Sequence, residues 1–245
     1  MIKVTVRYMV LVVAGWVVGR TGVAKAAPTE EQCQAALYKA AGVYAACQGA
    51  VQAQFKVAGD TFKLLQAASK CRVKYASNWP KLKKKYTGTG TTCDQERFTA
   101  TATTVTDNLT GLTWEKKDST CPGAHCVDSL YAWSNAITGA DGTVFTDALT
   151  SLNSGACFEG QCDWRLPTRD ELQTIISDPY TGSRCTTTAC IDPVFGPAQG
   201  SGYWSATTET GSVENAWVVL FDSGSLGRDR KGIPGDYLRA VRGGL

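Results

Sequence analysis

The chain has 245 residues, enough for two small domains or one large one, and it carries ten cysteines and a single histidine. The single histidine argues against zinc sites and against nucleophilic triads with a histidine base. The formal net charge of +3 combines two parts of opposite sign, because residues 27–92 hold ten basic and three acidic side chains, whereas residues 93–245 hold 11 basic and 19 acidic ones.

The N-terminus has the features of a secretory signal peptide. Lys3 and Arg7 precede an apolar stretch at 8–19, and Ala24-Lys25-Ala26 forms a small-x-small cleavage site. The apolar stretch spans about a dozen residues, whereas a membrane-spanning helix needs roughly 20. We expect residues 1–26 to be a signal peptide and the mature protein to be secreted or periplasmic. A signal retained as an N-terminal anchor is the alternative.

All ten cysteines follow this site, so they would meet an oxidising compartment. An even number there predicts a disulfide framework. Zinc is the competing interpretation, but the C-x4-C spacing is longer than the usual C-x2-C, and we expect no metal. Three pairs enclose four residues each and are expected to form local disulfides: Cys121 with Cys126, Cys157 with Cys162, and Cys185 with Cys190.

Residues 27–92 are predicted to form a basic helical hairpin. They are rich in good helix formers, and apolar side chains recur at spacings of three and four from Leu37 to Cys47. The break is expected at 58–61, with Asp60 or Thr61 as the cap of the second helix. Pro80 is expected to bend that helix or to start a new one.

The hairpin also predicts two disulfides. Cys47 and Cys71 are each twelve residues from Gly59, so a chain reversal at this glycine brings them face to face. We therefore pair Cys47 with Cys71. This leaves Cys33 for Cys93, near the open end of the hairpin.

A basic run at the end of the hairpin is a candidate binding surface. It consists of Lys81, Lys83, Lys84 and Lys85, which suit an anionic surface such as nucleic acid, polysaccharide or anionic lipid. A solvated helical face or a charged linker is the alternative. Because no nucleic-acid motif accompanies the run and an exported protein rarely meets its nucleic acid, we expect no nucleic-acid partner.

Residues 93–245 have the composition of strands and loops. Thr103–Thr106 and Leu112–Lys116 are predicted to form a hairpin, with Gly111 able to take a positive φ in the turn. Short helices are expected at 128–137 and 146–152.

A further helix is expected after Thr168, because Thr168 and Glu171 have the spacing of a capping box and apolar residues follow on one face. Four late strands complete the prediction, at 203–207, 216–221, 225–231 and 237–242.

Six sequence blocks follow one another in the second part. They are Arg97-Phe98, residues 105–116, residues 162–168, Tyr203–Thr207, Ala216-Trp217 and residues 238–243. In this order they resemble the bacterial family named after the C-terminal domain of the Legionella collagen-like adhesin. The Arg-Leu-Pro-Thr, Trp-Ser and closing Val-Arg blocks also resemble landmarks of the formylglycine-generating-enzyme branch of C-type-lectin-like folds.

The predicted elements give an α+β fold class, with the disulfide-linked helical hairpin at 27–92. The resemblance further implies that the domain at 93–245 is C-type-lectin-like. The namesake adhesin binds sulfated polysaccharide, so the resemblance also implies an adhesin-like role. We interpret the landmark side chains as structural, because large aromatics dominate the cores of small domains. They are Trp164, Arg165, Leu166, Pro167, Thr168, Trp204 and Arg242.

We expect a binding module and no enzyme. His125 is the only candidate histidine base, and no Gly-x-Ser-x-Gly, phosphate-loop or His-Glu-x-x-His motif occurs. The formylglycine-generating branch works with a copper-binding cysteine pair, but local disulfides explain the late cysteines better. An oxidase of this kind remains an alternative, and we expect no cofactor.

Candidate ligand contacts are Arg228, Arg230 and Lys231, whose cationic groups suit sulfate or carboxylate. An exposed hairpin tip is the other interpretation of these residues. The leading function is an exported module that binds an anionic polysaccharide or a cell-surface protein. A structural or assembly protein of the envelope, self-associating through the basic hairpin, is the alternative.

Overall fold

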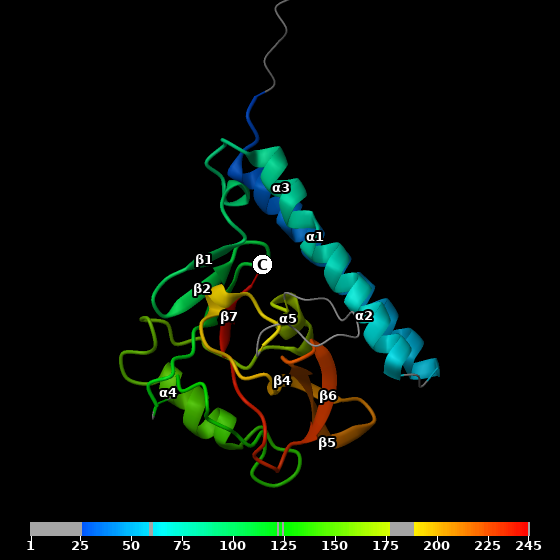
Figure 1. Cartoon of the computed structure of the whole chain (residues 1–245), viewed down its shortest axis with the longest axis vertical. Coiled ribbons are helices and arrows are strands. Elements are labelled where there is room, and N and C mark those ends of the chain that lie inside the picture. Colours follow the sequence, from blue (N-terminus) through cyan, green and yellow to red (C-terminus); the bar gives the residue numbers. More distant parts are fainter. Residues whose placement is uncertain (1–25, 59–60, 122, 124, 177–188, 245) are drawn as a thin grey trace, which may run out of the picture.

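The computed structural model describes residues 26–58, 61–121, 123, 125–176 and 189–244, so that residues 1–25 of the expected signal peptide lie outside this range. A helical unit packs along one side of an α+β domain (Figure 1). The helical unit comprises α1 (Glu30–Ala58), α2 (Thr61–Ala76) and α3 (Asn78–Tyr86). The later elements are η1 (Thr92–Asp94), β1 (Phe98–Ala100), β2 (Thr104–Asp107), β3 (Leu112–Glu115), η2 (Val144–Leu149), α4 (Thr150–Asn153), α5 (Arg169–Thr174), η3 (Pro193–Phe195), β4 (Gly202–Glu209), β5 (Ser212–Leu220), β6 (Ser225–Arg230) and β7 (Val241–Gly243).

The first two helices form the predicted hairpin. α1 ends and α2 begins on either side of the expected break, and the proposed cap Asp60 lies outside the described residues. Of the two outcomes expected at Pro80, the structure has a new helix, because α2 ends at Ala76 and α3 starts two residues before the proline.

The disulfides of the hairpin follow the predicted pairing. Cys47 bonds to Cys71 across α1 and α2, and Cys33 bonds to Cys93 at the open end. Two local disulfides are also present, Cys121 with Cys126 and Cys157 with Cys162. Cys190 is disulfide-bonded as well, and its predicted partner Cys185 lies outside the described residues.

Two antiparallel sheets form the later part of the chain, one in the order β1-β2-β3-β7 and the other in the order β4-β5-β6. The predicted hairpin is present as β2 and β3, whose register pairs Val105 with Trp114, and Gly111 takes a φ of 68° in the turn. β7 pairs with β3 through Val241 and Trp114, so the end of the chain completes the first sheet.

One hydrophobic core joins the helical unit to the sheets. Leu37, Tyr44 and Tyr75 from the helices belong to the same cluster of buried side chains as Trp114 and Phe195. Burial of such large apolar groups stabilises folded proteins by about 1.5–3 kcal/mol per side chain. The junction is therefore built mainly from apolar and aromatic contacts, although the two parts carry opposite net charge.

The predicted helix at 128–137 is wrong. This segment is irregular, and its backbone pairs with the chain around 231–236: the Tyr131 N–H donates to the Asp236 carbonyl at 3.0 Å, and the Trp133 N–H donates to the Lys231 carbonyl at 2.9 Å. The Trp133 indole N–H donates to the Ser205 carbonyl at 3.0 Å. Partners distant in sequence thus satisfy polar groups that a helix would satisfy locally.

The other predicted elements are largely present. η2 and α4 occupy the expected helical region at 146–152, and the Thr168 hydroxyl and Glu171 carboxylate form the capping box of α5. Strands β4, β5 and β6 overlap the expected ones, whereas the last strand is shorter, because regular pairing begins only at Val241.

Candidate functional site

The predicted ligand contacts at the end of β6 are engaged with the protein itself. Arg228 forms an ion pair with Glu209, and Arg230 lies 3.3 Å from a carboxylate oxygen of Glu214. Lys231 is buried, with 2% of its surface exposed. The three side chains therefore do not form one exposed cationic cluster.

The surroundings of Lys231 explain its burial. Its ammonium group lies 4.0 Å from the centroid of the Trp133 ring and donates to the Thr208 hydroxyl at 2.9 Å. An aromatic face attracts a cation in this position. Burial lowers the pKa of Lys231, and a side chain with so little exposed surface is a poor contact for a sulfate group in solvent.

Asp236 forms a carboxyl pair with Asp229 of β6. Burial, followed by the charge of Asp229 and a hydrogen bond with it, raises the pKa of Asp236 from its usual 3.8 to about 7. Between these two pH values the folded protein holds a proton that the unfolded chain releases. Acidification in this window therefore stabilises the folded state.

We expect the free energy of unfolding to rise as the pH falls from 7 to about 4, and the Asp236→Asn variant to lose this part of the pH dependence. Urea unfolding of both proteins at a series of pH values measures the difference. An equal pH dependence in the variant and the parent protein would contradict the assignment.

The helical unit carries the larger exposed cationic surface. Six lysines on it are exposed: Lys39, Lys70, Lys74, Lys81, Lys84 and Lys85. None of the six forms an ion pair within the described part of the chain, whereas the half-buried Lys83 pairs with Glu96. We call these six residues the basic hairpin surface.

Three members of this surface line one groove of about 280 Å³ between the helices. Lys39 comes from α1, Lys74 from α2 and Lys81 from α3, and the remaining lining is largely apolar, including Val43 and Leu82. No carboxylate is among the lining residues. The three lysines therefore give the groove a positive potential.

The predicted basic run contributes only part of this groove. Of Lys81, Lys83, Lys84 and Lys85, the structure places Lys81 in the groove lining together with Lys39 and Lys74. The symmetry of the hairpin about Gly59, which also pairs the cysteines, is the sequence signal that places Lys39 near Lys81. Lys39 precedes Gly59 by 20 residues, and Lys81 follows it by 22.

The landmark residues of the later part make internal contacts. Arg165 donates two hydrogen bonds to the Glu171 carboxylate, at 2.8 and 2.7 Å, and Arg242 donates to Asp163 at 2.6 Å. The Trp164 indole N–H donates to the Phe158 carbonyl at 3.1 Å, and Trp204 is fully buried. Leu166 and Pro167 are buried as well, and Thr168 caps α5.

His125 lies in a buried charge network. Its Nδ1 atom is 2.8 Å from a carboxylate oxygen of Glu115. The Lys117 ammonium donates a hydrogen bond to the same oxygen. The His125 ring also packs against Phe158, with 4.1 Å between ring centroids. The histidine is thus held by the local disulfide loop and a buried carboxylate.

The nearby cluster of Cys121, Cys126 and Asp128 brings three ligand-type atoms within 4.8 Å of one another. The two cysteines are bonded to each other, so that they do not offer thiolates to a metal ion.

Within the described residues, no helix combines the length and the apolar character needed to cross a membrane.

The family model described as the Lcl C-terminal domain matches residues 103–242, which is more than half of the chain. The searches of curated proteins and of solved structures returned no match. The match spans every strand from β2 to β6, together with α4 and α5. The chain therefore belongs to the Lcl C-terminal domain family.

Proposed function

We propose that this protein is an exported, non-catalytic binding module that recognises anionic polysaccharide through the basic hairpin surface. The observation that carries the proposal is the groove lined by Lys39, Lys74 and Lys81, since these exposed lysines have no carboxylate partner in the described part of the chain. Sulfate and carboxylate groups of a polysaccharide supply the missing negative charges.

The alternative cationic residues fit this role less well. Arg228 and Arg230 each face a glutamate, so a polysaccharide would have to displace an existing ion pair before it gained a new one. Lys231 would also have to leave its position over Trp133. An exposed lysine without a partner loses only its hydration and side-chain freedom on binding.

Family membership and the disulfides support the adhesin-like part of the proposal. The Lcl C-terminal domain is adhesin-associated, and the disulfides fit a protein that folds in an oxidising compartment. We infer that residues 1–26 direct export and that the later part has a C-type-lectin-like fold. The mixed α+β architecture and the internal contacts of Arg165 and Trp204 are compatible with this fold.

An assembly role is the second candidate, because apolar side chains lie exposed on the same helices. Tyr38, Val43 and Val73 are 56%, 46% and 46% exposed. Self-association through these groups would give a molecular mass that rises with protein concentration. A constant monomer mass in sedimentation would instead leave the hairpin surface available to polysaccharide.

Binding of the mature protein to immobilised dextran sulfate and to neutral dextran, at low and high salt, tests the proposal. We expect dextran sulfate to bind at low salt and to be released at high salt, because exposed charges interact over about 10 Å only at modest ionic strength. Equal binding to both polymers, or binding that is insensitive to salt, would contradict recognition through charge.

A further inference from the structure

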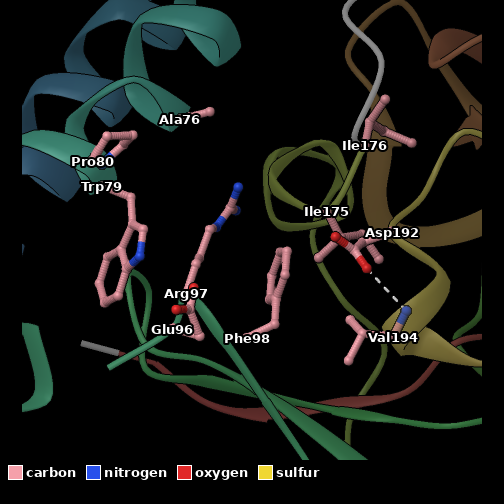
Figure 2. Close-up of a pocket in the computed structure, with 10 residues that line it drawn as sticks. All are labelled: Ala76, Trp79, Pro80, Glu96, Arg97, Phe98, Ile175, Ile176, Asp192 and Val194. Atoms are coloured by element: carbon pink, nitrogen blue, oxygen red, sulfur yellow. Dashed lines mark hydrogen bonds between the residues drawn. The ribbon is translucent and has the colours of Figure 1, made fainter. Parts of the chain in front are cut away.

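A second pocket lies where the helical unit meets the sheets. Its volume is about 510 Å³, within the range of small-molecule sites. One wall comes from the start of α3, with Trp79 and Pro80, and the other from the two residues that follow α5 and from η3 with its cap (Figure 2). Arg97 and Phe98, from the chain entering β1, project between the two walls.

Trp79 lines this pocket and carries a hydrogen-bond donor without a partner among the described residues. Its side chain is buried, with 5% of the residue exposed, and its indole N–H has no hydrogen-bond partner in the described part of the chain. Figure 2 shows the indole nitrogen on the edge that faces Arg97 and the interior of the pocket. A buried donor without a partner is costly, so an acceptor from a ligand would satisfy a group that the fold leaves unpaired.

The positive charge of Arg97 is already neutralised. Its Nε and Nη2 atoms donate to the two carboxylate oxygens of Asp107 at 3.2 and 3.0 Å, and Nη2 also donates to the Thr174 carbonyl at 2.7 Å. The guanidinium is 4.5 Å from the centroid of the Phe98 ring. The pocket therefore offers no free cation to an anionic group.

Acceptors lie on both sides of the pocket. Asp192 uses one carboxylate oxygen to accept the Val194 N–H at 2.9 Å, and Figure 2 shows the carboxylate facing the interior. Glu96, on the opposite side, is 79% exposed and pairs with Lys83 at the rim. Phe98, Ile176 and Val194 supply apolar surface between these polar groups.

We propose that this pocket binds a single uncharged sugar ring. Sugar hydroxyls act both as donors, which suits the Asp192 carboxylate, and as acceptors, which suits the Trp79 indole N–H. The C–H face of a sugar ring matches the aliphatic Ile176 and Val194 side chains, whereas the Phe98 ring is already packed against Arg97 and Phe195. A carboxylated or sulfated sugar would instead bring its charge close to Asp192 and Glu96, so this site selects neutral rings, unlike the basic hairpin surface.

The test is titration of the mature protein with the methyl glycosides of glucose, galactose, mannose and N-acetylglucosamine, followed by saturation-transfer NMR. We expect at least one of them to bind and the Trp79→Phe variant to weaken that binding about fivefold, the effect of one hydrogen bond. Asp192→Asn should weaken it as well, while the asparagine oxygen keeps the hydrogen bond to the Val194 N–H.

Trp114→Phe is the matched control. The Trp114 indole N–H is also buried without a partner in the described residues, but Trp114 does not line this pocket. The Trp114→Phe variant should leave the sugar affinity unchanged. Binding by none of the four glycosides, or equal weakening by the two tryptophan variants, would overturn the proposal. Dextran sulfate binding does not depend on this outcome, so the two sites can fail separately.

Discussion

Replacement of Glu115 by glutamine is expected to lower the free energy of unfolding by about 3–5 kcal/mol, the cost of breaking a buried ion pair by removing one partner. Glu115 is fully buried. One carboxylate oxygen accepts from the Lys117 ammonium at 2.8 Å, and the other accepts the Ala240 N–H at 3.0 Å. The variant would remove the carboxylate that pairs with the buried Lys117 ammonium.

The pKa of Glu115 has the same physical origin. Burial alone would raise it, but the Lys117 charge and the hydrogen bonds from His125, Lys117 and the Ala240 N–H together lower it. The stabilisation from this carboxylate is therefore present at neutral pH and is lost as the pH falls through its lowered folded-state pKa.

Urea denaturation at pH 7 measures the effect of Glu115→Gln, and Glu171→Gln is the matched control. Glu171 pairs with Arg165, but both side chains are partly exposed, at 22% and 41%. Glutamine can also serve in a capping box, so this control should cost about 1 kcal/mol or less. Similar losses in the two variants would contradict the role assigned to the buried network.

Removal of the Cys33–Cys93 disulfide is the second large effect expected. This bond closes a loop with a sequence separation of 60, and the loop-entropy relation assigns about 4 kcal/mol to a loop of that size. Both cysteines are also fully buried, so alanine replacements lose packing as well. The bond ties the start of α1 to the segment that enters β1.

The Cys121–Cys126 disulfide provides the comparison, because its sequence separation is 5 and the same relation gives about 2 kcal/mol. Thermal and urea unfolding of the two double-alanine variants should therefore rank the Cys33–Cys93 bond as the more stabilising. The reverse order would mean that the helical unit is held on the sheets without need of this disulfide.

The elements that the sequence predicts well depend on local spacing. The hairpin and its Cys47–Cys71 bond follow from a helical period on both sides of Gly59, and the α5 cap follows from Thr168 and Glu171. Each of these patterns can be read within a few turns of the chain. Their physical cause is therefore visible without the tertiary structure.

The failures concern contacts distant in sequence. Tyr131 and Trp133 resemble helix residues in isolation, but their backbone groups pair with Asp236 and Lys231 about a hundred residues later. Lys231 follows two exposed arginines in the sequence, although it turns inward beneath Trp133. Of the groove lysines, Lys81 belongs to the predicted basic run, whereas Lys39 and Lys74 were missed because they come from other helices.

The most direct test of the proposed function compares two variants that each remove two positive charges. Lys74→Gln with Lys81→Gln alters the basic groove, and Arg228→Gln with Arg230→Gln alters β6. Since each exposed charge pair contributes up to about 1 kcal/mol, we expect the lysine variant to weaken dextran sulfate binding about tenfold. The arginine variant should bind as the parent protein does. Equal weakening by both variants, or a loss confined to the arginine variant, would contradict recognition through the basic hairpin surface.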